Sequence, residues 1–117
     1  VTGVQTCALP IYRSIDRIVS LGAAAIYVTH FSAIRDVSRL SADLHRLIDA
    51  HVALARACRD AGPQRHRLLR DGVRDLLVAE GGRQGWALAG APLLELISLD
   101  VELNAQGLGA WLDASAD

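Results

Sequence analysis

The feature that most constrains this chain is one uncharged run, residues 24–29, set among segments with helical periodicity. A short run without charge on either face is typical of a strand covered on both sides, as in a sheet packed between helices. The sequence contains no second run of this kind, and one strand cannot form a sheet by itself. The run therefore predicts a core strand whose pairing partners lie outside this chain.

Composition excludes several classes of protein. Hydrophobic residues make up 51% of the chain and the formal net charge is −1, so we expect neither a disordered chain nor a nucleic-acid-binding protein. No apolar segment approaches the roughly 18 residues that a membrane span needs. Cys7 and Cys58 make neither a disulfide framework nor a metal-ligand pair with useful spacing. We therefore expect a cytoplasmic protein that does not act on membranes.

The first eleven residues differ from the rest. The stretch VTGVQTCALPI, residues 1–11, has no clean period and resembles the translated product of a sequencing-library adaptor, and the chain contains no Met. We exclude this stretch from functional reasoning, as for a fusion scar. The native sequence is expected to begin near Tyr12, with the residues that precede it in the gene missing.

The remaining sequence predicts four helices. Ser14 is a candidate N-cap for a short helix that Gly22 ends. Three longer helices are predicted over residues 37–60, 64–79 and 92–112, with a flexible Gly-rich break before the last. Their expected inward faces are Leu40, Leu44, Leu47, His51, Leu54 and Cys58 in the first; Leu69, Val73, Leu76 and Leu77 in the second; and Leu93, Leu96, Ile97, Val101, Leu108 and Trp111 in the third.

His30 is the candidate for chemistry, because it follows the predicted strand directly. Loops at the carboxyl ends of buried strands commonly carry functional groups, since the strand fixes the position of the side chain. A neutral imidazole there suits a metal ligand or a general base. The alternative is a strand-end His that bonds only a backbone carbonyl, and position alone leaves both interpretations open.

The other polar candidates favour structural roles. His51 lies within an apolar stripe and is expected to be a packed, hydrogen-bonded core residue. His45 and His66 are expected to be solvated. Asp100 and Asn104 lie one turn apart on the predicted inner side of the last helix, where they could line a substrate pocket or, as we favour, satisfy neighbouring backbone groups.

Two segments resemble a known family. The stretches YRSIDRIVSLGAAAIYVTHFSAIRDVSRLSADLHRLI and DVELNAQGLGAWLD are similar to the C-terminal part of metallo-β-lactamase-fold hydrolases, in particular the glyoxalase-II-like branch with a helical extension. The resemblance implies an α/β fold class: the C-terminal part of a four-layer αβ/βα sandwich, with this chain mainly α-helical around one core strand. Residues 12–36 would belong to the edge of the metallo-hydrolase core and residues 37–117 to the helical extension.

The resemblance also implies a role for His30. In this family the His of a Thr-His-Phe-Gly motif binds one metal of a two-metal site, usually zinc, with iron or manganese also open here. Ser32 stands where the family has Gly. The implied activity is hydrolysis of a small ester, thioester or related substrate by a metal-activated hydroxide. The other ligands would lie upstream, so the chain alone is expected to be inactive. A homodimer through the helical extension is left open.

Two further hypotheses come from other classes of protein. The tail of a nucleotide-binding ATPase could present His30 as a switch histidine to the γ-phosphate, which predicts more strand after it. A non-catalytic helical interaction module would use the apolar faces of residues 37–112, but it leaves the strand and its His unexplained.

Overall fold

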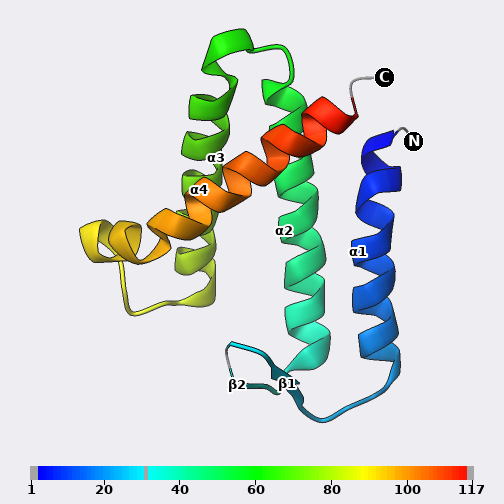
Figure 1. Ribbon diagram of the computed structural model, residues 1–117. Helices are drawn as coiled ribbons and strands as arrows, with labels where there is room; N and C mark the ends of the chain where they lie inside the picture. Colours follow the sequence, from blue (N-terminus) through cyan, green and yellow to red (C-terminus); the bar gives the residue numbers. More distant parts are fainter. Residues whose placement is uncertain (1–2, 31, 116–117) are drawn as a thin grey trace. The chain divides into compact units, whose positions relative to one another are not determined.

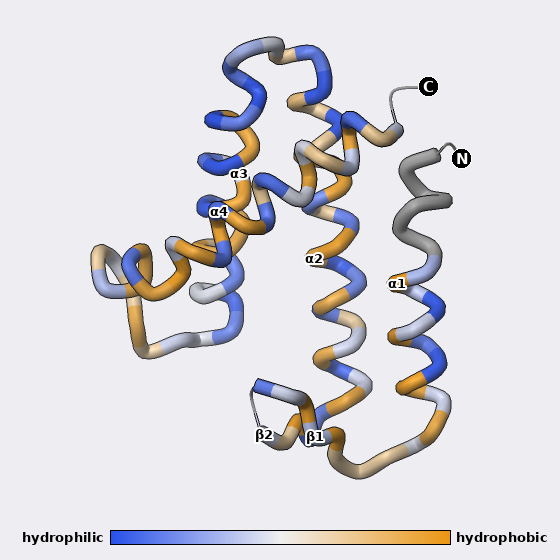
Figure 2. The backbone as a smooth tube through the Cα atoms, in the orientation of Figure 1, coloured by the Kyte–Doolittle hydropathy of each residue, from blue (hydrophilic) through white to orange (hydrophobic). Residues whose placement is uncertain are grey.

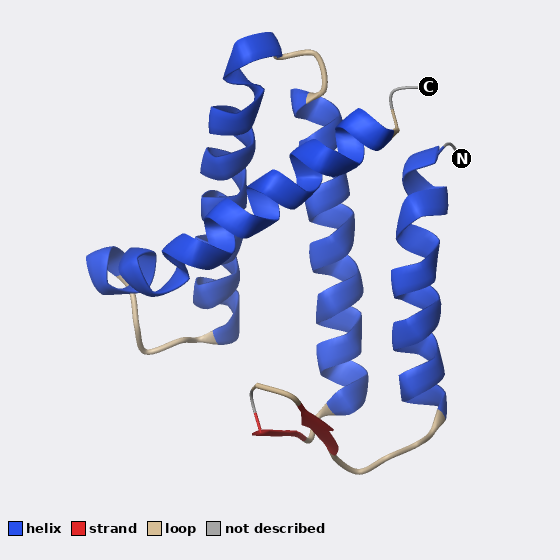
Figure 3. Ribbon diagram, viewed as in Figure 1, coloured by secondary structure: helices blue, strands red, loops and turns tan. Residues whose placement is uncertain are grey.

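The protein is mostly helical, with one small sheet (Figures 1 and 3). A computed structural model describes residues 3–30 and 32–115, with side chains from residue 10 onward. The elements in chain order are α1 (Gly3–Ser20), β1 (Ile26–Val28), β2 (Ser32–Ile34), α2 (Val37–Cys58), the 3-10 turn η1 (Gly62–Gln64), α3 (Arg65–Gln84) and α4 (Gly90–Ala114). The chain divides into an N-terminal unit, Val1–Asp49, and a C-terminal unit, Ala50–Asp117.

Helix α1 ends as predicted but begins earlier. Gly22 adopts φ +64 after the helix, a conformation that suits glycine. The predicted N-cap at Ser14 is wrong, because the helix already begins at Gly3 and runs through Pro10. The Ser14 hydroxyl instead donates to the Pro10 carbonyl at 2.9 Å. This bond back to the preceding turn is the usual role of a serine inside a helix.

The predicted strand forms a hairpin. β1 pairs antiparallel with β2 in the register Ile26↔Ile34, Tyr27↔Ala33 and Val28↔Ser32. The prediction of a single strand without a partner in the chain is therefore wrong: residues expected to form a turn satisfy its backbone groups locally. Tyr27 is 79% exposed, so the strand is also not covered on both faces. The reason is that no other described element of this unit packs over that face.

Helix α2 forms where the sequence predicts it. It begins at Val37 and ends at Cys58, and Gly62 and Pro63 then form the turn η1. Gly62 has φ +58, so the chain reverses at a residue without a Cβ. The half-buried His51 lies on this helix with its Nε2 shielded from solvent. The prediction that His51 is a packed core residue is confirmed only in part, because His51 is half-buried and is not among the buried side chains of the described residues.

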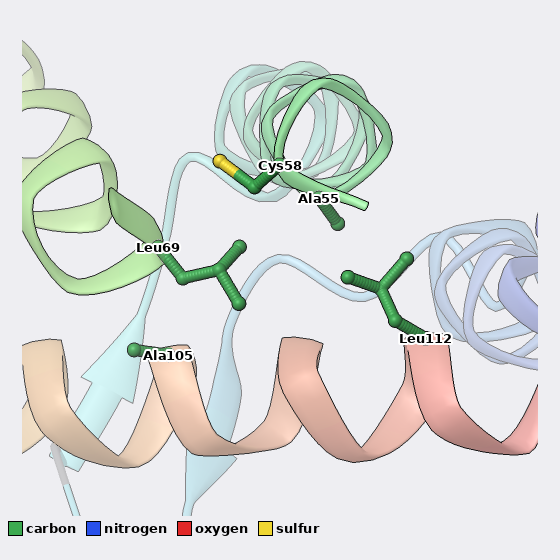
Figure 4. Close-up of a cluster of buried hydrophobic side chains, with 5 residues drawn as sticks. All are labelled: Ala55, Cys58, Leu69, Ala105 and Leu112. Carbon is green, nitrogen blue, oxygen red and sulfur yellow. The ribbon is translucent and has the colours of Figure 1, made fainter. Parts of the chain in front are cut away.

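The C-terminal unit has a core built by the end of α2 together with α3 and α4. One buried cluster contains Ala55, Cys58, Leu69, Ala105 and Leu112 (Figure 4). A second contains Val73, Leu93, Ile97 and Val101. Leu54 and Leu108 pack against both clusters and join them into one core. The inner faces predicted for α3 and for the C-terminal end of α2 are largely confirmed, and Cys58 is a buried core residue as expected. The prediction is wrong for Leu44, which is 45% exposed.

The inward face of α4 differs in part from the prediction. Leu96 was expected inside but is 68% exposed, whereas Ala105 and Leu112 are buried. A helix turns about 100° per residue, so Leu96 cannot share the narrow face that Ile97 and Val101 bury. Asp100 and Asn104 are also exposed, so the prediction that they lie on the inner side is wrong.

The Gly-rich break is mostly helix. Gly81 and Gly82 continue α3, which ends at Gly85 with φ +69. A Cβ on Gly81 would lie 2.7 Å from Cε3 of Trp86, and the Trp86 backbone N–H donates to the Gly81 carbonyl at 2.9 Å. Trp86 therefore folds back onto the last turn of α3.

Among the described residues, no helix combines the length and apolarity needed to cross a membrane.

Candidate functional site

His30 lies in the turn that directly follows β1, and its side chain is exposed. The antiparallel pairing on either side of the turn fixes where the backbone of this residue lies. The neighbouring Thr29 is exposed as well, while Phe31, the third residue of the predicted motif, is outside the described residues. The strand-end position expected for His30 is thus confirmed. Its role as a metal ligand stays a prediction.

The turn contains an unusual backbone conformation. Ser32 has φ 61, and it is the one non-glycine residue with positive φ in the part of the chain that the structure describes. This left-handed region costs an ordinary residue roughly 1–2 kcal/mol and costs glycine little. The conformation therefore favours glycine at the position where the resembled family has glycine.

The described residues do not form a complete metal site. They bring no three His, Cys, Asp or Glu side chains together as a possible ligand set. A catalytic zinc is held by three protein ligands, and a structural zinc by four. His30 can supply one nitrogen, so this chain's own described residues do not fit a bound metal without further ligands.

A polar cluster joins α1 to the first half of α2. The Tyr12 hydroxyl donates to Oδ1 of Asp49, and the Tyr12 ring meets the His45 ring edge-on with centroids 5.0 Å apart. His45 Nε2 lies 3.3 Å from Oδ1 of Asp16. The prediction that His45 is solvated is wrong, because Tyr12 covers it and leaves it half-buried. The sequence reasoning missed this cluster, since its members come from two helices.

Tyr12 is the residue of this cluster with a shifted pKa. Burial, then the hydrogen bond with Asp49 and the negative charge of that carboxylate, raise the pKa of Tyr12 to about 12 from its ordinary value of 10.0. All three causes disfavour the phenolate. Tyr12 therefore stays protonated and acts as a hydrogen-bond donor at neutral pH, so the cluster holds two helices together and does not supply a nucleophile.

The C-terminal unit contains a second pair with a histidine. His66 Nε2 lies 3.0 Å from Oε1 of Glu102, and the His66 side chain is half exposed, as predicted. A hydrogen bond from Gln106, then the positive charges of His66 and Arg70, lower the pKa of Glu102. Such exposed pairs contribute little to stability. The pair links α3 to α4 at the surface.

Glu80 is a buried carboxylate that the sequence reasoning missed. It is the one buried polar or charged side chain found among the described residues, and Gln84 Nε2 donates to its Oε1 at 2.7 Å. The signal was available, because Glu and Gln four residues apart on a helix lie on one face. Glu80 directly precedes Gly81, on which Trp86 packs. Glu80 therefore lies at the end of α3, next to the residues that begin the connection to α4.

Comparison with protein-family models, with curated proteins and with solved structures finds no match to this chain. Arguments about function therefore depend on the residues themselves and on the turn that carries His30.

Proposed function

We propose that this chain is the C-terminal part of a metal-dependent hydrolase with the metallo-β-lactamase fold, of the glyoxalase-II-like branch, acting on an ester, thioester or related small substrate. In this proposal His30 is one ligand of the metal site. The observation that carries the proposal is the turn after β1. It presents an exposed imidazole and then uses a left-handed residue, Ser32, where the resembled motif has glycine.

The exposure of the hairpin supports the same proposal. Tyr27 on β1 is 79% exposed although its strand carries no charge. An uncharged strand of this kind is normally covered on both faces. In the proposed protein, residues 12–36 form an edge of the four-layer αβ/βα core, whose other layers cover Tyr27, and residues 37–117 form a helical extension.

The remaining metal ligands belong to polypeptide outside this chain in this proposal. Zinc, iron and manganese all accept imidazole and carboxylate ligands, so the metal could be any of the three. Because His30 alone cannot hold a catalytic metal, the chain by itself is expected to have no hydrolase activity. The upstream reading frame should encode a His-Xaa-His-Xaa-Asp-His motif, and a frame that lacks this motif would contradict the proposal.

The test is a substitution in the complete protein. His30→Ala should lower the metal bound per chain. It should also reduce thioester hydrolysis by at least about 10–100-fold, which is the loss typical when a residue that only hydrogen-bonds to a metal ligand is changed. His66→Ala is the matched control, since His66 is an exposed histidine on another element. Elemental analysis and a thioesterase assay measure both. Unchanged metal content in His30→Ala would reject the ligand role.

A non-catalytic helical interaction module is the second candidate. It is favoured by three large apolar side chains on one face of α4, Leu96, Leu99 and Leu103, which are 68%, 66% and 53% exposed. The ATPase alternative has no comparable support. It predicts more strand and a short regulatory region after His30, whereas in the described residues one three-residue strand, β2, follows His30 and then only helices.

A further inference from the structure

The outward face of α4 is apolar along its middle turns. At about 100° per residue, Leu96, Leu99 and Leu103 fall within about 60° of one another on the helix. Ile97, Val101 and Ala105 are buried on roughly the opposite side. Figure 2 shows hydrophobic residues on successive turns of α4. A helix that is apolar on two opposite faces normally packs against neighbours on both.

The spacing of these leucines is that of a helix-pairing seam. Steps of three and then four residues correspond to positions a, d and a of a heptad, with Leu96 and Leu103 at a and Leu99 at d. All three side chains are more than half exposed. We name them the outer leucine stripe. Their regular spacing fits another helix better than it fits a small molecule, which needs a concave site.

The charged residues that α4 itself places beside the outer leucine stripe are all acidic. In the same heptad Glu95 and Glu102 take position g and Asp100 takes position e. Glu95 and Asp100 are exposed and lie on opposite sides of the stripe. Helix α4, Gly90–Ala114, contains no Lys or Arg. Glu102 also faces His66 and Arg70 of α3. Glu95 and Asp100 are therefore the main negative charges that a helix bound to the stripe would meet.

These charges decide between two kinds of occupant. If two copies paired through this stripe in parallel, Glu95 of one would face Asp100 of the other. In the antiparallel arrangement, Glu95 would face Glu102, and Asp100 would face its own counterpart. Both arrangements place like charges together, which opposes pairing. A partner with basic residues at the flanking positions would instead be attracted along the whole seam.

We propose that the outer leucine stripe of α4 binds an amphipathic helix of a different polypeptide, with apolar residues at its a and d positions and Arg or Lys at e and g. The outer leucine stripe contains none of the residues on which the hydrolase proposal rests, so the inference does not depend on that proposal. It also replaces the homodimer that the sequence left open with a heterotypic contact.

The test uses the full chain and two synthetic helical peptides of about four heptads, long enough to hold helical structure when bound. Both peptides carry Leu at a and d; one has Lys and Arg at e and g, and the other has Glu. Fluorescence anisotropy at low salt measures binding. The basic peptide should bind about tenfold or more tightly than the acidic one, because several exposed ion pairs replace repulsions.

Substitutions in the chain locate the contact. Leu99→Glu should weaken binding of the basic peptide by about tenfold or more, and Leu103→Gln should weaken it in the same direction. Leu21→Glu is the matched control, because Leu21 is 75% exposed and lies outside α4. Glu95→Arg combined with Asp100→Arg should reverse the preference between the peptides. Circular dichroism should show unchanged helix content in each variant.

Three outcomes would overturn the proposal. The first is equal affinity for the two peptides, or binding of neither. The second is binding that Leu99→Glu and Leu103→Gln leave unchanged. The third is self-association of the chain, seen by sedimentation, that Leu99→Glu abolishes, because a second copy would then be the occupant of the outer leucine stripe.

Discussion

The two units of the chain bury their apolar residues to different extents. Every buried hydrophobic side chain found in the described residues lies in the C-terminal unit, from Ala55 to Leu112. In the N-terminal unit, the helices α1 and α2 meet through the polar cluster around Tyr12, and Ile18, Leu21 and Tyr27 are exposed. The C-terminal unit thus completes a core from its own residues. The N-terminal unit does not, which is what the proposed edge of a larger core requires.

The aromatic residues allow the two units to be followed separately. Trp86 and Trp111 are the chain's 2 Trp residues and lie in the C-terminal unit, while its 2 Tyr residues, Tyr12 and Tyr27, lie in the N-terminal unit. Tryptophan fluorescence therefore reports on one unit, and tyrosine absorbance difference reports on the other.

The largest effect is expected from Leu69→Ala. Leu69 is fully buried between α2 and α4, and removing such a side chain costs about 2–5 kcal/mol because a cavity remains. Urea unfolding measures the loss, followed by tryptophan fluorescence for Leu69→Ala and by tyrosine absorbance for Leu44→Ala, because each signal reports on the unit that carries the change. Leu44→Ala, at an exposed leucine of the N-terminal unit, should change stability by no more than about 0.5 kcal/mol. A similar loss of stability in both variants would show that the two units do not differ in how well they bury their leucines.

A glycine pair in α3 tests how closely the helices of the C-terminal unit pack. A Cβ on Gly72 would overlap with Cδ1 of Leu54, whereas a Cβ on Gly82 would meet nothing within 4 Å. Gly72→Ala should destabilise by about 1–3 kcal/mol, because Leu54 must move. Gly82→Ala should stabilise by about 0.5–1 kcal/mol through helix propensity. The same urea measurement applies, and equal stabilisation by both changes would show that the close approach is absent.

Ser32→Gly tests the backbone conformation of the hairpin in the N-terminal unit. Relief of the left-handed backbone at φ 61 should stabilise the hairpin by about 1 kcal/mol. Ser32→Val should have the opposite effect, since a β-branched side chain tolerates this conformation poorly. Hydrogen exchange at the amides of β1 and β2 measures both. Equal protection in the two variants would show that the turn does not require a positive φ.

The smallest effect concerns Tyr12. Its pKa is raised to about 12 from 10.0, so folding favours the protonated phenol. The stability that Tyr12 contributes is complete below pH 10, the value for the unfolded chain, and is lost as the pH rises through about 12. Tyr12→Phe should abolish this alkaline loss, while the exposed Tyr27→Phe should leave it unchanged. Alkaline titration followed by circular dichroism and tyrosine absorbance checks the result, and a loss at pH 10–12 that persists in Tyr12→Phe would contradict it.

Helix positions were predictable because they depend on local periodicity. The steps of three and four residues from Leu40 to Cys58 predicted α2 within two residues of its end, and Gly62 marked the turn that follows. The pairing of β1 with residues 32–34 was not predictable from periodicity. A segment of three residues is too short to show whether its side chains alternate as in a strand. The position of His30 after a strand was predictable, and its proposed role as a metal ligand stays a prediction.

By itself the sequence determined where α2, most of α3 and most of α4 lie, and that one uncharged strand precedes an imidazole. These features depend on residues close together in the sequence: the spacing of apolar side chains, glycine at positive φ, and proline after a helix. The sequence missed residues 3–13 of α1 and the last turn of α3. The tertiary structure alone decided that Leu96 faces outward while Ala105 is buried, that His45 is covered by Tyr12, and that Glu80 is buried. Those outcomes depend on which helix faces meet, and residues far apart in the sequence determine that contact.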